Sequence, residues 1–212
     1  MDLALSLGTI IAMNIAAWLA PGPNMLAVMT ASLTLGRTHG LATGFGLACG
    51  ALIWAILAVL GVAVLFDLFP KAVIAIKLAG AGYLVWLGLK SIRAARKHND
   101  TISLPKAHER ALKQSFQSGF IVSMTNPKAA LFFGSVMTAF IPATASNWFL
   151  AVVVAICGLL AVVLHSITAT VFSTNAAVEV FRRFQTAISY AFGVTFVGLG
   201  GSIAYAAVRR TS

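Results

Sequence analysis

Acidic residues are the scarcest feature of this sequence. The chain of 212 residues contains five Asp and Glu side chains, and charged residues of all kinds make up 9% of it. Soluble globular domains carry about 25% charged residues. Together with 59% hydrophobic residues and a mean hydropathy of +0.93, this scarcity excludes a water-soluble single domain. It also excludes intrinsic disorder, which requires low hydrophobicity and high net charge.

Cysteine is also rare. Cys49 and Cys157 each lie inside a hydrophobic run, so neither a disulfide framework nor a zinc site is expected. The sequence has no HExxH motif, no nucleophile elbow and no pair of acids inside a hydrophobic run. We therefore expect no cofactor, no metal ion and no catalytic residue, and no motif supports an integral membrane enzyme.

Long hydrophobic runs take the place of these features. About 20 apolar residues cross a bilayer as a helix, and runs this long favour helices over barrel strands. The amino terminus lacks a basic segment and its run is too long for a signal peptide, so we expect it to remain as the first helix. We predict an all-α polytopic membrane protein with six transmembrane helices, in residues 3–36, 41–66, 72–89, 116–141, 148–172 and 186–208.

Basic residues are distributed unevenly between the predicted loops. The loops after the first, third and fifth helices hold Arg37, Lys90, Arg93, Arg96, Lys97, Lys106, Arg110, Lys113, Arg182 and Arg183, whereas the opposite side holds Lys71, Arg209 and Arg210. Cytoplasmic loops carry the excess of Lys and Arg. We therefore expect both termini outside and the 90–113 loop in the cytoplasm.

This distribution explains most of the net charge of +10 without a nucleic-acid partner. Binding of the 90–113 loop to anionic lipid head groups is an alternative role for its charge. A solvated cytoplasmic loop is the favoured interpretation.

The two halves of the chain resemble one another. Pro23-Asn24-Met25-Leu26 matches Pro127-Lys128-Ala129-Ala130, Leu47 to Gly50 matches Ala155 to Gly158, and Leu87-Gly88-Leu89 matches Val197-Gly198-Leu199. Three helices per half is an odd number, so the two repeats would insert with opposite orientations. We predict a single domain over 1–212, with repeat one at about 1–92, a loop at about 90–114 and repeat two at about 115–212. Chance similarity between hydrophobic runs is the alternative.

Proline interrupts the first predicted helix of each half. Pro21-Gly22-Pro23 and Asn126-Pro127 lie inside hydrophobic runs, where proline removes a hydrogen-bond donor and frees a carbonyl. Interrupted helices at corresponding places in inverted repeats are typical of the central site of a secondary transporter. The alternative is that these prolines only kink helices for packing.

Polar residues beside these breaks are the candidate binding groups. A lysine deep in a hydrophobic run is costly and usually functional, so Lys128 is favoured to bind a substrate carboxylate over snorkelling to the membrane interface. Asn24 and Asn126 each offer a donor and an acceptor to a zwitterion. Asn14 is a further polar group of the first run.

Other polar residues have structural interpretations. Lys77 lies near the end of its predicted helix, which favours snorkelling. His165 lies within the fifth run, where packing is favoured over a role as a proton carrier. The dense glycines favour close helix packing, which also permits a homodimer.

Two proline-containing motifs and the segment between them resemble a known family. Pro21-Gly22-Pro23-Asn24 near the start and Asn126-Pro127-Lys128-Ala129-Ala130-Leu131-Phe132-Phe133 at mid-chain, with Lys77 to Leu84 between them, are similar to the LysE/RhtB family of bacterial amino-acid exporters, which includes threonine-, homoserine- and leucine-type efflux proteins. The resemblance extends over nearly the whole chain.

The resemblance implies secondary export of amino acids across the bacterial inner membrane, coupled to protons. It implies a transport site formed by Pro21, Gly22, Pro23, Asn24, Asn126, Pro127 and Lys128, and the supporting candidates are Asn14, Gly50, Tyr83 and His165. Many members of the family resemble a pattern with an acidic residue directly after the second glycine of the second helix. This chain has Ala51 at that position. This departure favours a neutral substrate over lysine or arginine.

Two other hypotheses remain beside an exporter of amino acids or related small metabolites. One is a membrane scaffold or regulatory protein that transports nothing, and the other, with less support, is an integral membrane enzyme. A passive channel is less favoured still, because interrupted helices at a repeat interface suit an occluded site better than an open pore.

Overall fold

The computed structural model describes residues 3–68, 70–96, 111–142 and 144–209, which form helices joined by short connections. No strand occurs among these residues, in agreement with the predicted all-α class. The helices of the described part are α1 (Leu3–Leu19), α2 (Pro23–Leu35), α3 (Arg37–Leu68), α4 (Pro70–Arg96), α5 (Leu112–Thr125), α6 (Pro127–Phe140), α7 (Asn147–Val171) and α8 (Asn175–Arg209).

Both proline-containing segments are helix breaks. α1 ends before Pro21, and α2 leaves the break at an angle of 56° to it. α5 ends at Thr125, and α6 begins two residues later. Pro23 and Pro127 are the first residues of α2 and α6, the helical position that tolerates proline because its N–H would have no intrahelical partner.

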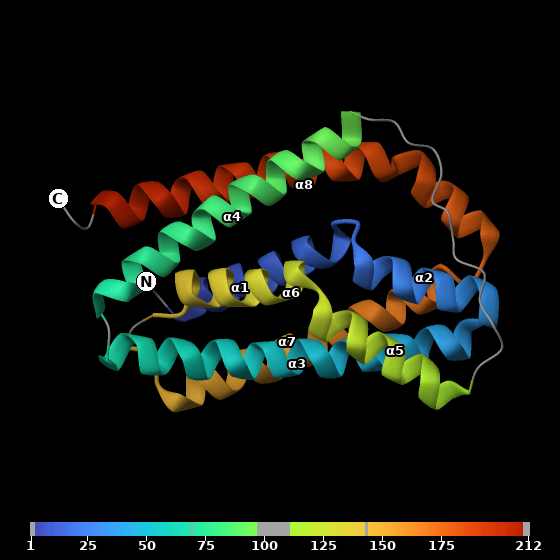
Figure 1. Ribbon diagram of the computed structural model, residues 1–212, viewed down its shortest axis with the longest axis horizontal. Helices are drawn as coiled ribbons and strands as arrows, with labels where there is room; N and C mark the ends of the chain where they lie inside the picture. Colours follow the sequence, from blue (N-terminus) through green and yellow to red (C-terminus); the bar gives the residue numbers. More distant parts are fainter. Residues whose placement is uncertain (1–2, 69, 97–110, 143, 210–212) are drawn as a thin grey trace.

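Helices from the two halves of the chain pack on one another. Figure 1 shows α4 lying along α8 and α1 lying beside α6, while α3 packs against both α5 and α7. The start of α1 and the end of α8 lie at the same end of the bundle (Figure 1). A core of large side chains fills the space between the helices, including Ile10, Leu84, Phe132, Phe149 and Phe196.

The structure corrects three predicted boundaries. α4 continues to Arg96 instead of ending at Leu89, and α8 begins at Asn175 rather than at residue 186. Arg93 and Arg183, which we expected in loops, are therefore helical. Arg and Lys are good helix formers, and basic residues in the last turn of α4 also interact favourably with the helix dipole, so charge ended the hydrophobic run without ending the helix.

The third correction concerns the turn predicted at residues 36–40. α2 and α3 are joined by Gly36 alone, since α3 already begins at Arg37. Gly36 has a φ of 94°, a backbone conformation that side chains with a Cβ atom rarely adopt. One glycine therefore makes the whole connection.

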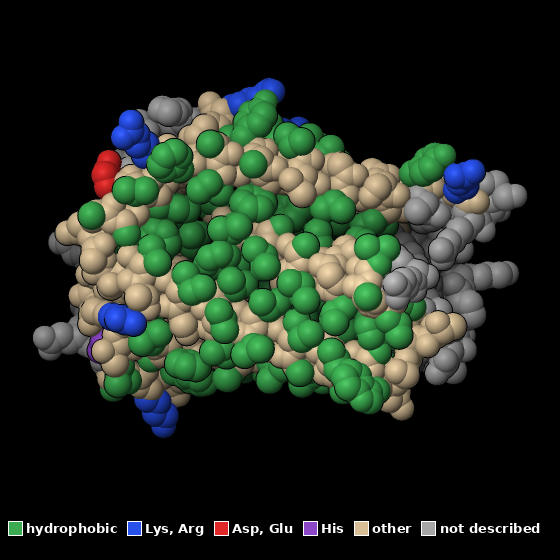
Figure 2. All heavy atoms as spheres, turned by 180° about the vertical axis from the view of Figure 1, so that it is seen from behind, with side chains coloured by type: hydrophobic (Ala, Val, Ile, Leu, Met, Phe, Trp, Pro, Cys, Tyr) green, Lys and Arg blue, Asp and Glu red, His purple; other side chains and the backbone are tan. Residues whose placement is uncertain are grey.

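One face of the bundle is apolar across its middle. Figure 2 shows hydrophobic side chains across the centre of one face, with Lys and Arg toward its margins. Among the described residues, three helices are long and apolar enough to cross a membrane, within Arg37–Gly61, Asn147–Val171 and Arg183–Tyr205, and the bent pair α1–α2 adds a fourth span if it is counted as one. The molecule is thus a polytopic helical membrane protein, and the count of six spans stays a prediction.

Two features predicted from sequence lie outside the described part. They are the side chain of Lys77 and residues 97–110 of the predicted cytoplasmic loop.

The homodimer also stays a prediction, because Gly88, Gly193 and Gly200 pack between α4 and α8 of the same chain.

Close backbone contact holds α3 against α5. A Cβ atom on Gly46 would lie 2.7 Å from the backbone nitrogen of Phe120, closer than packed atoms come. A Cβ atom on Gly119 would likewise collide with the carbonyl of Thr43. The two helices therefore approach closely because each has a glycine where it faces the backbone of the other.

We expect Gly46→Ala to lower the free energy of unfolding by about 1–3 kcal/mol, the usual cost of overpacking. The matched control is Gly82→Ala in α4, where nothing lies within 4 Å of an added Cβ atom. Thermal unfolding of both purified variants in the same detergent checks this expectation. Equal melting temperatures for the two variants would contradict the close α3–α5 contact.

Candidate functional site

The break between α1 and α2 frees backbone carbonyls inside the molecule. In an α-helix the carbonyl of Ala17 would accept a hydrogen bond from residue 21, but Pro21 has no N–H to donate. The ammonium of Lys128 replaces it: Nζ donates to the carbonyl oxygen of Ala17 at 3.2 Å and to that of Ala20 at 2.9 Å. A side chain from the second half of the chain thus closes a helix end in the first half.

The break between α5 and α6 is closed by a different donor. The carbonyl of Ser123 loses its helical partner because residue 127 is proline. It accepts instead from the indole Nε1 of Trp54 in α3, at 3.2 Å, and from the backbone nitrogen of Asn126, at 3.3 Å. Each proline break therefore has a side-chain donor from another helix.

Two asparagines join the breaks to one another. Asn126 Nδ2 donates to Asn24 Oδ1 at 2.7 Å, and the backbone N–H of Lys128 donates to Asn126 Oδ1 at 3.0 Å. Asn126 is only 6% exposed, and both of these hydrogen bonds are partly buried. The amide pair holds the first turn of α2 against the first turn of α6.

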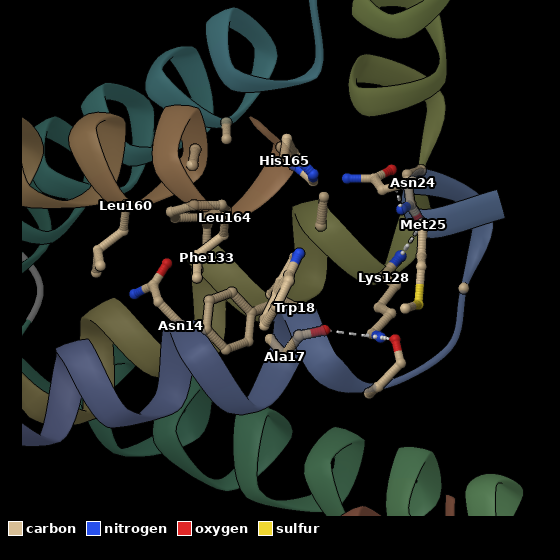
Figure 3. Close-up of a pocket in the computed structure, with 17 residues that line it drawn as sticks. Asn14, Ala17, Trp18, Asn24, Met25, Lys128, Phe133, Leu160, Leu164 and His165 are labelled. Carbon is tan, nitrogen blue, oxygen red and sulfur yellow. Dashed lines mark hydrogen bonds between the residues drawn. The ribbon is translucent and has the colours of Figure 1, made fainter. Parts of the chain in front are cut away.

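A cavity of about 100 Å³ opens beside these residues. About 10–15 Å³ accommodates one water molecule, so the cavity has room for a small organic molecule. Figure 3 shows its wall. The lining residues are Asn14, Ala17, Trp18, Ala20, Gly22, Asn24, Met25, Ala51, Asn126, Lys128, Ala129, Phe132, Phe133, Leu160, Ala161, Leu164 and His165.

The charges of the cavity wall are one-sided. Among the described residues of the lining, Lys128 is the one that carries a formal charge, and none is Asp or Glu. The N-termini of α2 and α6 add the positive ends of two helix dipoles, while the negative C-terminal end of α1 is neutralised by the ammonium. The polar end of the cavity therefore suits an anionic group, and the remaining wall suits apolar atoms.

Several residues predicted from sequence meet at this cavity. Gly22, Asn24, Asn126 and Lys128 line it from the two breaks, and Asn14 and His165 line it from α1 and α7. Their functional roles stay predictions.

Other predicted residues lie outside the lining. Pro21 and Pro23 belong to the first break and not to the described lining, and the side chain of Pro127 lies outside the described part of the structure. Gly50 packs on the side chain of Ser123, and Tyr83 packs on Trp86 with ring centroids 5.6 Å apart.

Sequence reasoning did not select the aromatic and aliphatic part of the wall. Trp18 is fixed by a hydrogen bond from Nε1 to Thr168 Oγ1 of α7, at 2.9 Å, and Phe132, Phe133, Leu160 and Leu164 complete the apolar side. Such residues look like ordinary span residues in a hydrophobic run. Only the position of Trp18, three residues before Pro21, was a usable signal. Ala51, noted as a departure from the family pattern, does face the cavity.

Comparison with known proteins gives one family. The model of the LysE type translocator family matches residues 15–207. The threonine efflux protein of Escherichia coli (strain K12) is 27% identical over 203 residues, which cover 91% of this chain and 94% of that protein. The threonine efflux protein of Salmonella typhi is 26% identical over 196 residues, with the same coverage.

An uncharacterized membrane protein of Pseudomonas aeruginosa is 33% identical over 202 residues, which cover 89% of each chain. No solved structure matches the chain.

We expect Asn126→Ala to lower the free energy of unfolding by about 1–3 kcal/mol, because it leaves buried polar groups on two helices unpaired. Asn147→Ala is the matched control, since Asn147 is exposed and the cap of α7 is provided by Ser146. Detergent-denaturation curves of the two purified variants give the comparison. If the Asn126→Ala protein had the same free energy of unfolding as the control, the amide pair would add nothing to stability.

Proposed function

Because the chain belongs to the LysE type translocator family, we propose that it is a secondary active exporter of amino acids or related small metabolites, with neutral substrates preferred. The observation that carries this proposal is the cavity between the two helix breaks, which combines one ammonium, three amides and a largely apolar wall. Threonine efflux proteins are among the relatives, which supports amino-acid substrates.

The proposed architecture is two inverted repeats of three spans each. In repeat one, at about 1–92, the spans are α1–α2, α3 and α4; in repeat two, at about 115–212, they are α5–α6, α7 and α8. Packing of α3 on α7 and of α4 on α8 supports this arrangement, since elements related by a pseudo-twofold axis meet at that axis. Movement of one repeat against the other would open the cavity to alternate sides of the membrane.

The proposed location is the bacterial inner membrane, with both termini outside and the 90–113 loop in the cytoplasm. The excess of Lys and Arg on that side supports the orientation, as does the placement of the start of α1 and the end of α8 at one end of the bundle (Figure 1). The proposed coupling ion is the proton.

In this proposal Lys128 supplies the positive charge that draws the substrate carboxylate into the cavity. Two of its three N–H donors are taken by the carbonyls of Ala17 and Ala20, and the third is left for a ligand. The lining supports recognition of a neutral amino acid, because a cationic side chain would meet Lys128 and no carboxylate among the described lining residues. At position 51 the side chain is the methyl group of alanine, so no acid is present at this position to pair with a cationic substrate.

We expect Lys128→Met to reduce efflux of neutral amino acids from loaded vesicles by about tenfold or more, because hydrogen bonds to charged groups contribute about 1.5–3 kcal/mol. Lys113→Met, at the exposed start of α5, is the matched control and should export normally. Undiminished efflux by Lys128→Met at equal protein content would remove Lys128 from the transport site.

We expect the wild type to prefer neutral amino acids to lysine and arginine by at least about tenfold, the effect of about 1.4 kcal/mol. Ala51→Asp should reduce this preference, since it places a carboxylate in the lining, whereas Ala51→Ser should keep it. A competition panel over the twenty amino acids measures both, and repeating it without a proton gradient tests coupling. Equal export of lysine and threonine by the wild type would contradict a neutral site.

A further inference from the structure

The orientations of the amides of Asn24 and Asn126 in the cavity are fixed by one backbone group. The N–H of Lys128 can only donate, so the atom of Asn126 that it contacts at 3.0 Å is the oxygen. The other end of this amide is therefore the NH2 group, and the atom of Asn24 that it meets at 2.7 Å must be an oxygen. Asn24 consequently turns its own NH2 group toward the cavity.

His165 reaches the same part of the cavity from α7. Its side chain is 8% exposed, and its Nδ1 is enclosed without a hydrogen-bond partner among the described residues. Figure 3 shows the imidazole and the amide of Asn24 turned toward one another. An unpaired buried N–H is rarer than an unpaired buried acceptor, so we assign the ring proton to Nε2, where it points out of the enclosed side.

The position of this ring is held by the packing of α7. A Cβ atom on Gly44 of α3 would lie 3.1 Å from the Cβ atom of His165, so the two helices touch directly behind the histidine. One turn further along α7, Thr168 accepts the hydrogen bond from Trp18 of α1. These two contacts fix the backbone and the Cβ atom of His165 relative to α1 and α3, so the side chain begins at a fixed point beside the cavity.

Two neutral donors thus face one another beside the N-terminus of α2. A carboxylate oxygen accepts from both an amide and an imidazole N–H, whereas an ammonium has only donors and would meet two more. The nearby ammonium of Lys128 and the positive ends of the helix dipoles add charge of the matching sign.

We propose that Asn24 and His165 form the carboxylate-binding subsite of the cavity, with Asn24 Nδ2 and His165 Nε2 donating to the carboxylate of a small substrate. This inference rests on the proposed function for the identity of the substrate, but the subsite itself is a property of the cavity. Lys128 then supplies the positive charge that attracts the carboxylate, and the two neutral donors determine the orientation of the carboxylate.

The His165→Leu variant distinguishes a ligand-binding role of His165 from a purely structural role. Leucine fills the buried position and removes a polar atom without a partner, so the unliganded protein should unfold at the same temperature or higher. Its affinity for carboxylate ligands should nevertheless fall by about 10- to 100-fold, the effect of losing a hydrogen bond to a charged group. His39→Leu is the matched control, since His39 pairs with Ser115 outside the cavity lining.

The probes are 2-aminobutyrate, butyrate, which lacks the ammonium, and propylamine, which lacks the carboxylate. Thermal stabilisation of the purified full-length protein reports binding of each. We expect 2-aminobutyrate and butyrate to stabilise the wild type and the His39→Leu variant, but His165→Leu only at much higher concentration, and propylamine to stabilise none of the three.

Two results would overturn the subsite: stabilisation of the wild type by propylamine as strong as that by 2-aminobutyrate, or unchanged affinity of His165→Leu for 2-aminobutyrate. Failure of the proposed function is a separate outcome. Vesicles that export no amino acid, together with carboxylate binding that depends on His165, would reject the exporter and keep the subsite.

Discussion

Backbone carbonyls released by proline must find new donors inside this molecule, and the arrangement of the site depends on how they do so. Water is not available in a bilayer core to satisfy such groups. The ammonium of Lys128 pairs with the carbonyls at the end of α1, and the indole of Trp54 pairs with the carbonyl of Ser123 at the end of α5. These two contacts connect each interrupted helix to an element distant in sequence, and the cavity is lined by Lys128 and by both residues whose carbonyls it contacts.

The same requirement determines the chemistry of the cavity. Once the ammonium and the indole have paired with the carbonyl ends, the helix ends still facing the cavity are the N-termini of α2 and α6. The asparagine pair that joins them turns one NH2 group inward. The site at the helix breaks thus has many hydrogen-bond donors, although Lys128 is the one cation among its described lining residues. It can attract an anionic group while its wall stays largely apolar.

The sequence predicted the breaks and the polar residues beside them because proline, asparagine and lysine are rare inside hydrophobic runs and each has a local physical consequence. It did not predict which carbonyls Lys128 contacts, since that depends on how α6 packs against α1, more than a hundred residues earlier in the chain. The apolar wall was equally hidden, because Phe133 and Leu164 look like any span residue. The ends of α4 and α8 were placed wrongly, since basic residues that end a hydrophobic run also favour continued helix.

The two helix breaks also differ in the charge of the side chain that closes them. One is closed by a neutral indole and the other by a full positive charge carried on α6. Any displacement of α6 along the membrane normal carries that charge through the transmembrane electric field, where a complete crossing is worth about 2.3 kcal/mol per 100 mV. In the proposed exporter, the balance between the arrangement open to one side of the membrane and the arrangement open to the other would therefore depend partly on membrane voltage, even for a substrate with no net charge.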